Sequence, residues 1–527
     1  MSISRRRFIQ STTSLFGMAA AGAWLTSCQK KISKPNILLI MADDMGFSDL
    51  GCYGSEIKTP HIDRLAREGL RFTQFYNAAR CCPTRASLLT GLYPHQVGMG
   101  GMVVRKPDES YTGAYQGYLN NECVTLAEAL KPVGYTTLMS GKWHVGEFRP
   151  VWPVDRGFDR YWGLISGAAN YYNVTRTKNH QPIRTMARDN EEIPLPTENF
   201  YMTDAITENA IEMLKENSDK PFFQYVAYTA PHWPLHALPE DIEKYKGKYM
   251  EGWDALRKKR YQKMVELGII RKEWGLSPKD EGAIDWENVP DHELMDLKMA
   301  IYAAQIDRMD QGVGKILQTL QEQGRLDNTI VLFLSDNGAC SEYGPLGHDF
   351  WENGVLPGGE ESYQSYGRSW SNASNTPFRL HKHWVHEGGI ATPLIVRWPQ
   401  MIPKGGKMTH QPGHIIDIMA TLIDIAGVEY PSNNNGNTVQ PLRGKSLLPV
   451  LRGKVREPHS YLFWEHEENK AVRHGKWKLV AESGKEWELY DIESDRSEMD
   501  DLAAEHPEIV KEMNIAWEQW ANKVGVK

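Results

Sequence analysis

Two adjacent cysteines open the segment of this chain whose residue types could do the most chemistry. The segment reads CCPTRASLLTG and begins at Cys81 and Cys82, with Arg85 close behind. A cysteine at a turn that leads into a helix lies in the positive field of the helix N-terminus, which lowers the pKa of its thiol. These residues alone indicate an activated nucleophile beside an arginine that binds anions. The alternative is a buried structural cysteine, and a single cysteine by itself favours that alternative.

Oxygen-bearing side chains follow two apolar segments of the chain. One pair comes directly after NILLIMA and the other shortly after IVLFL: Asp43, Asp44, Asp336 and Asn337. If both segments are strands of one parallel sheet, their carboxyl ends meet and the side chains can converge on one ion. Oxygen-only ligands favour Ca²⁺ or Mg²⁺ over zinc, and Ca²⁺ is our preferred ion. For the first pair alone, a solvated acidic loop explains the sequence equally well.

Four basic side chains lie in or after other segments of the chain. Lys142 and His144 share one side of an extended segment, because alternate residues of a strand face the same way. His232 follows the apolar run FFQYVA, and Lys382 lies five residues before the first residue of the run EGG. Taken singly, each of the four is more simply explained as a surface or structural residue. Only their joint occurrence favours an anion-binding site.

The elements that must position these side chains alternate between apolar strands and helices. Such alternation predicts an α/β fold, with a large mixed, mostly parallel sheet sandwiched by helices. A charged region at residues 245–287 is expected to be a solvated helical insertion. The predicted strands are residues 36–42, 222–227, 330–334 and 393–396, and the predicted helices are residues 294–309, 313–323 and 415–425.

The pattern changes after the linker SNNNGNTVQP. Short antiparallel strands are predicted at residues 460–465, 471–473, 476–481 and 487–492, with a terminal helix at residues 506–524. We therefore expect a catalytic domain at residues 34–428. A smaller C-terminal α+β subdomain with a short antiparallel sheet is expected at residues 429–527.

The first 27 residues have the pattern of an export signal. Three arginines and Phe8-Ile9 precede a short apolar run, which resembles a twin-arginine signal. The following Leu-Thr-Ser-Cys resembles a bacterial lipobox, in which Cys28 is lipidated. We therefore expect a bacterial periplasmic or cell-surface lipoprotein that uses the export machinery and a lipid anchor. The alternative is an ordinary cleaved signal with an incidental cysteine.

Composition excludes several other classes of protein. The chain has 527 residues, 60 Lys+Arg against 67 Asp+Glu, and a formal net charge of −7, which argues against nucleic acid as a partner. Its six cysteines are too scattered for a disulfide scaffold.

The cysteine segment resembles the signature of the type I sulfatases, C-x-P-[S/T]-R-x-x-x-L-T-G. The stretch APHWPLHALPEDIEKYKGKY is similar to the bacterial arylsulfatase-like branch of the same alkaline phosphatase superfamily. The resemblance implies an alkaline-phosphatase-like fold. It also implies that a maturation enzyme oxidises Cys81 to formylglycine, and that Cys82 occupies a variable position.

The resemblance further implies a role for each site residue. Asp43, Asp44, Asp336, Asn337 and the modified Cys81 would bind the cation. A hydroxyl of the formylglycine gem-diol would attack sulfur and form a covalent sulfo-enzyme. Four basic residues would serve the reaction as follows: Arg85, Lys142 and Lys382 stabilise the sulfuryl oxygens, and His232 with Lys382 protonates the leaving alcohol. His144 would deprotonate the second hydroxyl and so release sulfate.

Three functions are consistent with these motifs. The preferred one is a sulfuric ester hydrolase acting on a sulfated glycan or an aryl sulfate. A phosphomonoester or phosphonate hydrolase of the same superfamily is the first alternative, because phosphate and sulfate esters both present tetrahedral anionic oxygens. The second is a non-catalytic glycan-binding lipoprotein, although no site residue is missing. The sequence does not identify the sugar.

Overall fold

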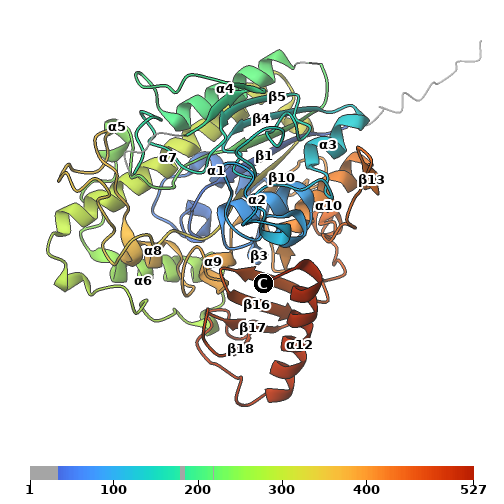
Figure 1. Ribbon diagram of the computed structural model, residues 1–527. Coiled ribbons are helices and arrows are strands. Elements are labelled where there is room, and N and C mark those ends of the chain that lie inside the picture. Colours follow the sequence, from blue (N-terminus) through green and yellow to red (C-terminus); the bar gives the residue numbers. More distant parts are fainter. Residues whose placement is uncertain (1–33, 179–183, 218) are drawn as a thin grey trace, which may run out of the picture. The chain divides into compact units, whose positions relative to one another are not determined.

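A ten-stranded sheet forms the centre of the computed structural model, which describes residues 34–178, 184–217 and 219–527 (Figure 1). The sheet is mixed but mostly parallel around its middle. In sheet order its strands are β11 (Lys407–Thr409), β2 (Leu70–Phe72), β10 (Leu394–Arg397), β9 (Thr329–Ser335), β1 (Asn36–Ala42), β8 (Phe222–Ala227), β4 (Thr136–Gly141), β5 (Arg160–Leu164), β6 (Met186–Arg188) and β7 (Glu191–Glu192).

Strand β1 lies between two parallel neighbours. Leu39 is in register with Tyr225 of β8 and with Leu332 of β9, and β4 continues the parallel order beyond β8. Every residue of β1 is buried, as its continuous apolar run predicts. The carboxyl ends of β1, β9, β8 and β4 therefore lie at one edge of the sheet, where α/β proteins bind their ligands.

Helices cover both faces of the sheet, which confirms the predicted fold class. Leu38 and Ile40 of β1 belong to one hydrophobic core, and Ile37, Leu39 and Met41 belong to the other. The first core includes residues of α1 (Pro60–Glu68), α4 (Met202–Glu216) and α7 (His292–Glu322), and the second includes residues of α2 (Cys81–Thr90), α3 (Leu126–Leu130) and α10 (Ile416–Ala426).

Helix α7 is a single helix, so the prediction of two helices at residues 294–309 and 313–323 is wrong. Gly312 and Gly314, at and beside the gap expected between the two helices, allow neighbouring helices to pack closely. A Cβ on Gly312 would lie 2.4 Å from Thr207 Oγ1 of α4, and a Cβ on Gly314 would lie 2.7 Å from ring atoms of His61 in α1. The missing side chains let α4 and α1 approach α7.

The predicted solvated insertion is also partly wrong, because α6 (Gly252–Glu266) buries one face. Trp253 and Arg260 of α6 are each 1% exposed. Arg260 Nη1 lies 2.6 Å from the carboxylate of Asp49, in the segment that follows the acidic pair after β1. A short helix, α5 (Pro239–Ile242), precedes this region, and two further short helices, α8 (Gly367–Ser374) and α9 (Glu387–Ile390), lie between β9 and β10.

A separate four-stranded antiparallel sheet follows near the C-terminus, as predicted. It consists of β15 (Leu462–His466), β16 (Asn469–His474), β17 (Trp477–Ala481) and β18 (Glu488–Asp491), and α12 (Pro507–Val524) packs against it (Figure 1). Residues 35–527 form one compact unit, and the boundary between residues 428 and 429 stays a prediction. A short helix, α11 (Leu448–Leu451), precedes this sheet.

The predicted export signal and Cys28 lie outside the described residues. Within the described part of the chain, no helix combines the length and the apolar character needed to span a bilayer.

Candidate active site

The four residues predicted to bind one ion, Asp43, Asp44, Asp336 and Asn337, lie together at the ends of β1 and β9. The backbone N–H of Asp44 donates to Asp336 Oδ1 at 3.2 Å, and Asn337 Nδ2 donates to Asp44 Oδ1 at 2.7 Å. All four side chains are buried, none being more than 1% exposed. Because β1 and β9 are parallel neighbours, their carboxyl ends bring residues about 290 positions apart into contact.

This group of oxygens fits a hard divalent cation. Asp43 Oδ1 and Asn337 Oδ1 are buried and have no hydrogen-bond partner among the described residues. Burial raises the pKa of Asp43, and burial together with the charge of Asp43 raises the pKa of Asp336 well above its ordinary value. A bound cation would relieve both effects, since it favours ionised carboxylates.

Cys81 is the first residue of α2 and is 2% exposed. A hydrogen bond from Cys82 lowers the pKa of the Cys81 thiol well below its ordinary value, and Lys142 and His144 add to this effect against the opposing effect of burial. The Cys81 sulfur lies within 4.8 Å of a ring nitrogen of His144. The structure therefore confirms that Cys81 stands at the start of a helix, as the sequence predicts.

Arg85, one turn further along α2, is fully buried. Its Nε and Nη2 donate to Asp336 Oδ2 at 3.1 and 2.8 Å, and its Nη1 donates to the carbonyl of Lys142 at 3.0 Å. Arg85 is absent from the residues that line the adjacent pocket. Arg85 therefore holds Asp336 in position, and its predicted contact with the sulfuryl oxygens stays a prediction.

Two lysines approach the carboxylates from other strand ends and loops. Lys142 follows β4 and donates to Asp43 Oδ2 at 2.6 Å, while Lys382 donates to Asp44 Oδ2 at 2.8 Å. Burial disfavours the charged form of Lys382, but Asp44, Cys340 and Glu342 together outweigh burial, so the pKa of Lys382 is raised well above its ordinary value. Burial likewise opposes ionisation of Asp44, yet His232 and Lys382 lower its pKa to about 2.

The two predicted histidines lie on the same cluster. His232 Nε2 is 3.4 Å from both Lys382 Nζ and Asp44 Oδ2. Burial lowers the pKa of His232 to about 4 and that of His144 to about 4. Both imidazoles are therefore neutral at pH 7 in the protein without ligands.

Five of the predicted residues line one pocket of about 220 Å³, namely Cys81, Lys142, His144, His232 and Lys382. Sequence reasoning missed most of its rim, which includes Arg80, Arg105, Glu147, Lys178, Arg184 and Glu342. Only Arg80 could have been found, because it directly precedes Cys81. The others come from loops with no recognisable spacing. Trp233 forms part of the wall, and its Nε1 donates to Glu342 at 3.0 Å.

Comparison with known proteins decides the family. The family model "Sulfatase" matches residues 35–428. The chain belongs to the sulfatase family. A second model, that of the C-terminal part of N-sulphoglucosamine sulphohydrolase, matches residues 378–523.

Individual sulfatases are similar over nearly the whole chain. An uncharacterized sulfatase of Schizosaccharomyces pombe is 36% identical over 94% of this chain and 95% of its own length. The arylsulfatase of Klebsiella aerogenes is 34% identical over 81% of this chain and 94% of its own. The crystal structure of Ps i-CgsB in complex with k-i-k-neocarrahexaose has a TM-score of 0.68 at 26% identity and covers 93% of each chain. The protein is thus a type I sulfatase of the alkaline phosphatase superfamily, a sulfuric ester hydrolase.

Proposed function

We propose that this sulfatase removes sulfate from a sulfated glycan, with aryl sulfates as alternative substrates. The reaction would use one divalent cation and a formylglycine, which a maturation enzyme would make from Cys81. The observation that supports this most strongly is the position of Cys81. It is the first residue of a helix and lines the pocket together with Lys142, His144, His232 and Lys382.

The cation would be held by Asp43, Asp44, Asp336 and Asn337, together with the modified Cys81, and Ca²⁺ is preferred over Mg²⁺. When bound, it would activate the nucleophile and neutralise charge on the sulfate oxygens. The formylglycine, once made, would supply a hydrated aldehyde as the nucleophile.

Lys142 and Lys382 would hold the sulfate group. Each ammonium is fixed by its own carboxylate, so its orientation is established before the substrate arrives. Both line the pocket, where a buried positive charge interacts with anionic oxygens more strongly than it would in water.

His232 and Lys382 would protonate the departing alcohol oxygen. His232 Nδ1 lies 2.5 Å from the carbonyl oxygen of Trp233, which can only accept a hydrogen bond, so Nδ1 carries the proton. Nε2 of the neutral ring then faces Lys382 Nζ at 3.4 Å. A proton shared by this pair is available to the leaving group.

His144 would act as the general base near position 81. Burial keeps its imidazole neutral at pH 7, which is the form that accepts a proton. Its Nδ1 has no hydrogen-bond partner among the described residues.

A carbohydrate substrate is favoured by the similar Ps i-CgsB, whose crystal structure contains k-i-k-neocarrahexaose. Export as a lipid-anchored protein, inferred from the first 28 residues, would place the enzyme where extracellular glycans are met.

The test is a substrate comparison with protein produced together with a formylglycine-generating enzyme. Mass spectrometry of the peptide that contains Cys81 should show conversion of the thiol to the aldehyde. We expect hydrolysis of para-nitrophenyl sulfate, its loss after chelation, and its recovery with Ca²⁺. Faster hydrolysis of para-nitrophenyl phosphate by fully converted enzyme would contradict the proposal.

A further inference from the structure

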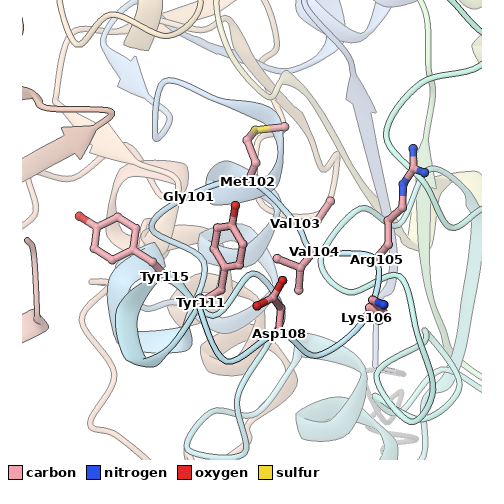
Figure 2. A pocket seen from close by; sticks show the side chains of 9 residues that line it. All are labelled: Gly101, Met102, Val103, Val104, Arg105, Lys106, Asp108, Tyr111 and Tyr115. Carbon is pink, nitrogen blue, oxygen red and sulfur yellow. The ribbon is translucent and has the colours of Figure 1, made fainter. Parts of the chain in front are cut away.

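A second hollow of about 380 Å³ lies beside the active-site pocket. Its lining comes from one loop, and Figure 2 shows Tyr111 and Tyr115 on one side of it and Arg105 and Lys106 on the other. Met102, Val103 and Arg105 line both this hollow and the active-site pocket. The two spaces therefore adjoin along the segment from Met102 to Arg105.

The loop that forms the hollow is held in place by its own backbone. Gly100 N–H donates to Ala114 at 2.8 Å, Gly117 N–H donates to Gly98 at 2.9 Å, and Val104 N–H donates to Gly117 at 3.1 Å. These hydrogen bonds close the loop on itself, so the hollow exists before any ligand binds.

The same loop contacts the helix that starts at Cys81. The Cys82 thiol lies 3.5 Å from Met102 Sδ and 4.0 Å from the carbonyl oxygen of Gly101. A ligand in the hollow would therefore be positioned relative to the residue that carries the proposed nucleophile.

The chemistry of the lining suits a carbohydrate that carries negative charge. Tyr111 is 50% exposed, although most large aromatic side chains of this protein are buried. Tyr115 is fixed by the hydrogen bond from its hydroxyl to Glu465 Oε2 at 2.9 Å. Aromatic rings with a polar tip pack against the faces of sugar rings and also reach their hydroxyls.

The charges of the lining point to an anionic substituent. Arg105 and Lys106 are exposed. Asp108 is the acid of the lining, and its carboxylate accepts hydrogen bonds from the backbone N–H and hydroxyl of Ser110 at 2.9 and 2.7 Å and also interacts with the charge of Lys106. With two basic residues and one acid, the lining keeps one net positive charge. A sulfate or carboxylate group on a sugar is the ligand that this arrangement would favour.

We propose that this hollow binds the sugar unit next to the one that bears the scissile sulfate. It would select an anionic oligosaccharide over a monosaccharide, with Tyr111 packing against the ring and Arg105 and Lys106 binding the negative group. The proposal rests on the proposed function, because the neighbouring sugar must belong to the substrate of the active-site pocket.

The test compares matched substrates of one and four sugar units. Sulfated monosaccharides and tetrasaccharides from chondroitin sulfate, heparan sulfate and carrageenan are assayed beside para-nitrophenyl sulfate. In at least one set, we expect the tetrasaccharide to have a kcat/KM about tenfold or more above that of its monosaccharide. Tyr111→Ala and Lys106→Ala should each remove most of this gain through KM, while the kcat/KM for para-nitrophenyl sulfate is retained. Arg452→Ala, at an exposed position of a different surface hollow, is the matched control and should change neither value.

These assays distinguish a failure of the second sugar site from a failure of the proposed function. Wild-type enzyme that cleaves para-nitrophenyl sulfate but prefers no tetrasaccharide would overturn the second sugar site alone. Variants that lower turnover of the aryl sulfate and the tetrasaccharide equally would also overturn it, because the loop would then act only structurally. Fully converted wild-type enzyme that cleaves no sulfate ester would overturn the proposed function itself.

Discussion

Each of the three buried carboxylates of the site forms an ion pair with a basic side chain. The three pairs are Lys142 with Asp43 at 2.6 Å, Lys382 with Asp44 at 2.8 Å, and Arg85 with Asp336 at 2.8 Å. The protein groups therefore balance one another in charge. A bound divalent cation would add positive charge that only an anionic ligand could neutralise, and for this reason an acidic protein can still bind a sulfate ester.

At the residue scale, His232 is expected to matter most for poor leaving groups. A general acid contributes little when the departing oxygen is already a stable anion, and much when it is an ordinary alcohol. His232→Ala should therefore lower kcat/KM about 10²-fold or more for a sugar sulfate, and far less for para-nitrophenyl sulfate. The measurement is kcat/KM across aryl sulfates whose phenols differ in pKa.

A steeper dependence on the leaving-group pKa in the variant is the predicted result. Equal losses for all esters would instead assign His232 to the binding of sulfate. His236 also has its pKa lowered to about 4 by burial, but its Nε2 lies 2.8 Å from the carbonyl of Ser362 and it does not line the pocket. His236→Ala is therefore the matched control, and it should leave the leaving-group dependence unchanged.

At the level of elements, the loop after β9 is in close contact with the short helix α9. A Cβ on Gly338 would lie 1.8 Å from the carbonyl oxygen of Gly388. Gly338 follows Asn337, and the backbone N–H of Gly338 donates to Gly389 at 3.0 Å. The absence of a side chain at Gly338 therefore sets the distance between two segments of the site.

Gly338→Ala should separate the loop after β9 from α9 and weaken the cation site. Because backbone must move to relieve the contact, we expect the concentration of Ca²⁺ that gives half-maximal activity to rise about tenfold or more. Gly359→Ala is the control, since its Cβ would meet nothing within 4 Å. An unchanged Ca²⁺ dependence in Gly338→Ala would show that the contact with α9 can widen without moving Asn337.

The elements carrying the site were more predictable than the rim of its pocket. The ends of β1, β9 and β8 could be located because continuous apolar runs identify strands buried on both faces. The continuity of helix α7 was not predictable from local pattern, because Gly312 and Gly314 weaken a helix in general but here allow side chains of α4 and α1 to pack closely. Rim residues such as Arg184 and Glu342 lie in irregular loops, whose positions depend on tertiary contacts rather than on local periodicity.

At the level of the whole described chain, a buried ionic cluster joins α9 to the four-stranded C-terminal sheet. Glu387 of α9 lies 3.0 Å from Lys478 of β17 and 2.7 Å from Arg496, which follows the C-terminal sheet. The hydroxyl of Tyr76, at the end of β3 (Phe75–Tyr76), donates to Glu387 at 3.2 Å. Since α9 begins five residues after Lys382, this cluster also supports the active-site loop.

Glu387→Gln is predicted to destabilise the protein in a pH-dependent way. Burial opposes ionisation of Glu387, but Lys478 and Arg496 lower its pKa from 4.5 to about 2. Ionised Glu387 therefore stabilises the fold fully above about pH 4.5, and this contribution is lost as the pH falls toward 2. Its size is on the order of 3 kcal/mol at pH 7.

Urea unfolding at pH 7 and at pH 3 measures this effect. The free energy of unfolding of Glu387→Gln should fall below that of the wild type at pH 7, and the difference should narrow at pH 3. Glu508→Gln alters a side chain that is 71% exposed and should have little effect at either pH. A difference that is constant with pH would show that the charge of Glu387 does not stabilise the junction.

The most direct test of the whole account compares the two adjacent cysteines. Cys81→Ala removes the residue that formylglycine formation requires, while Cys82→Ala changes a neighbour whose thiol faces Met102. Turnover of para-nitrophenyl sulfate is measured for both variants, with the folded state of each checked by thermal unfolding. We predict that Cys81→Ala loses activity to the level of the blank, and that Cys82→Ala retains it within a few-fold. Near-normal turnover by Cys81→Ala would contradict the assignment of Cys81 as the precursor of the nucleophile.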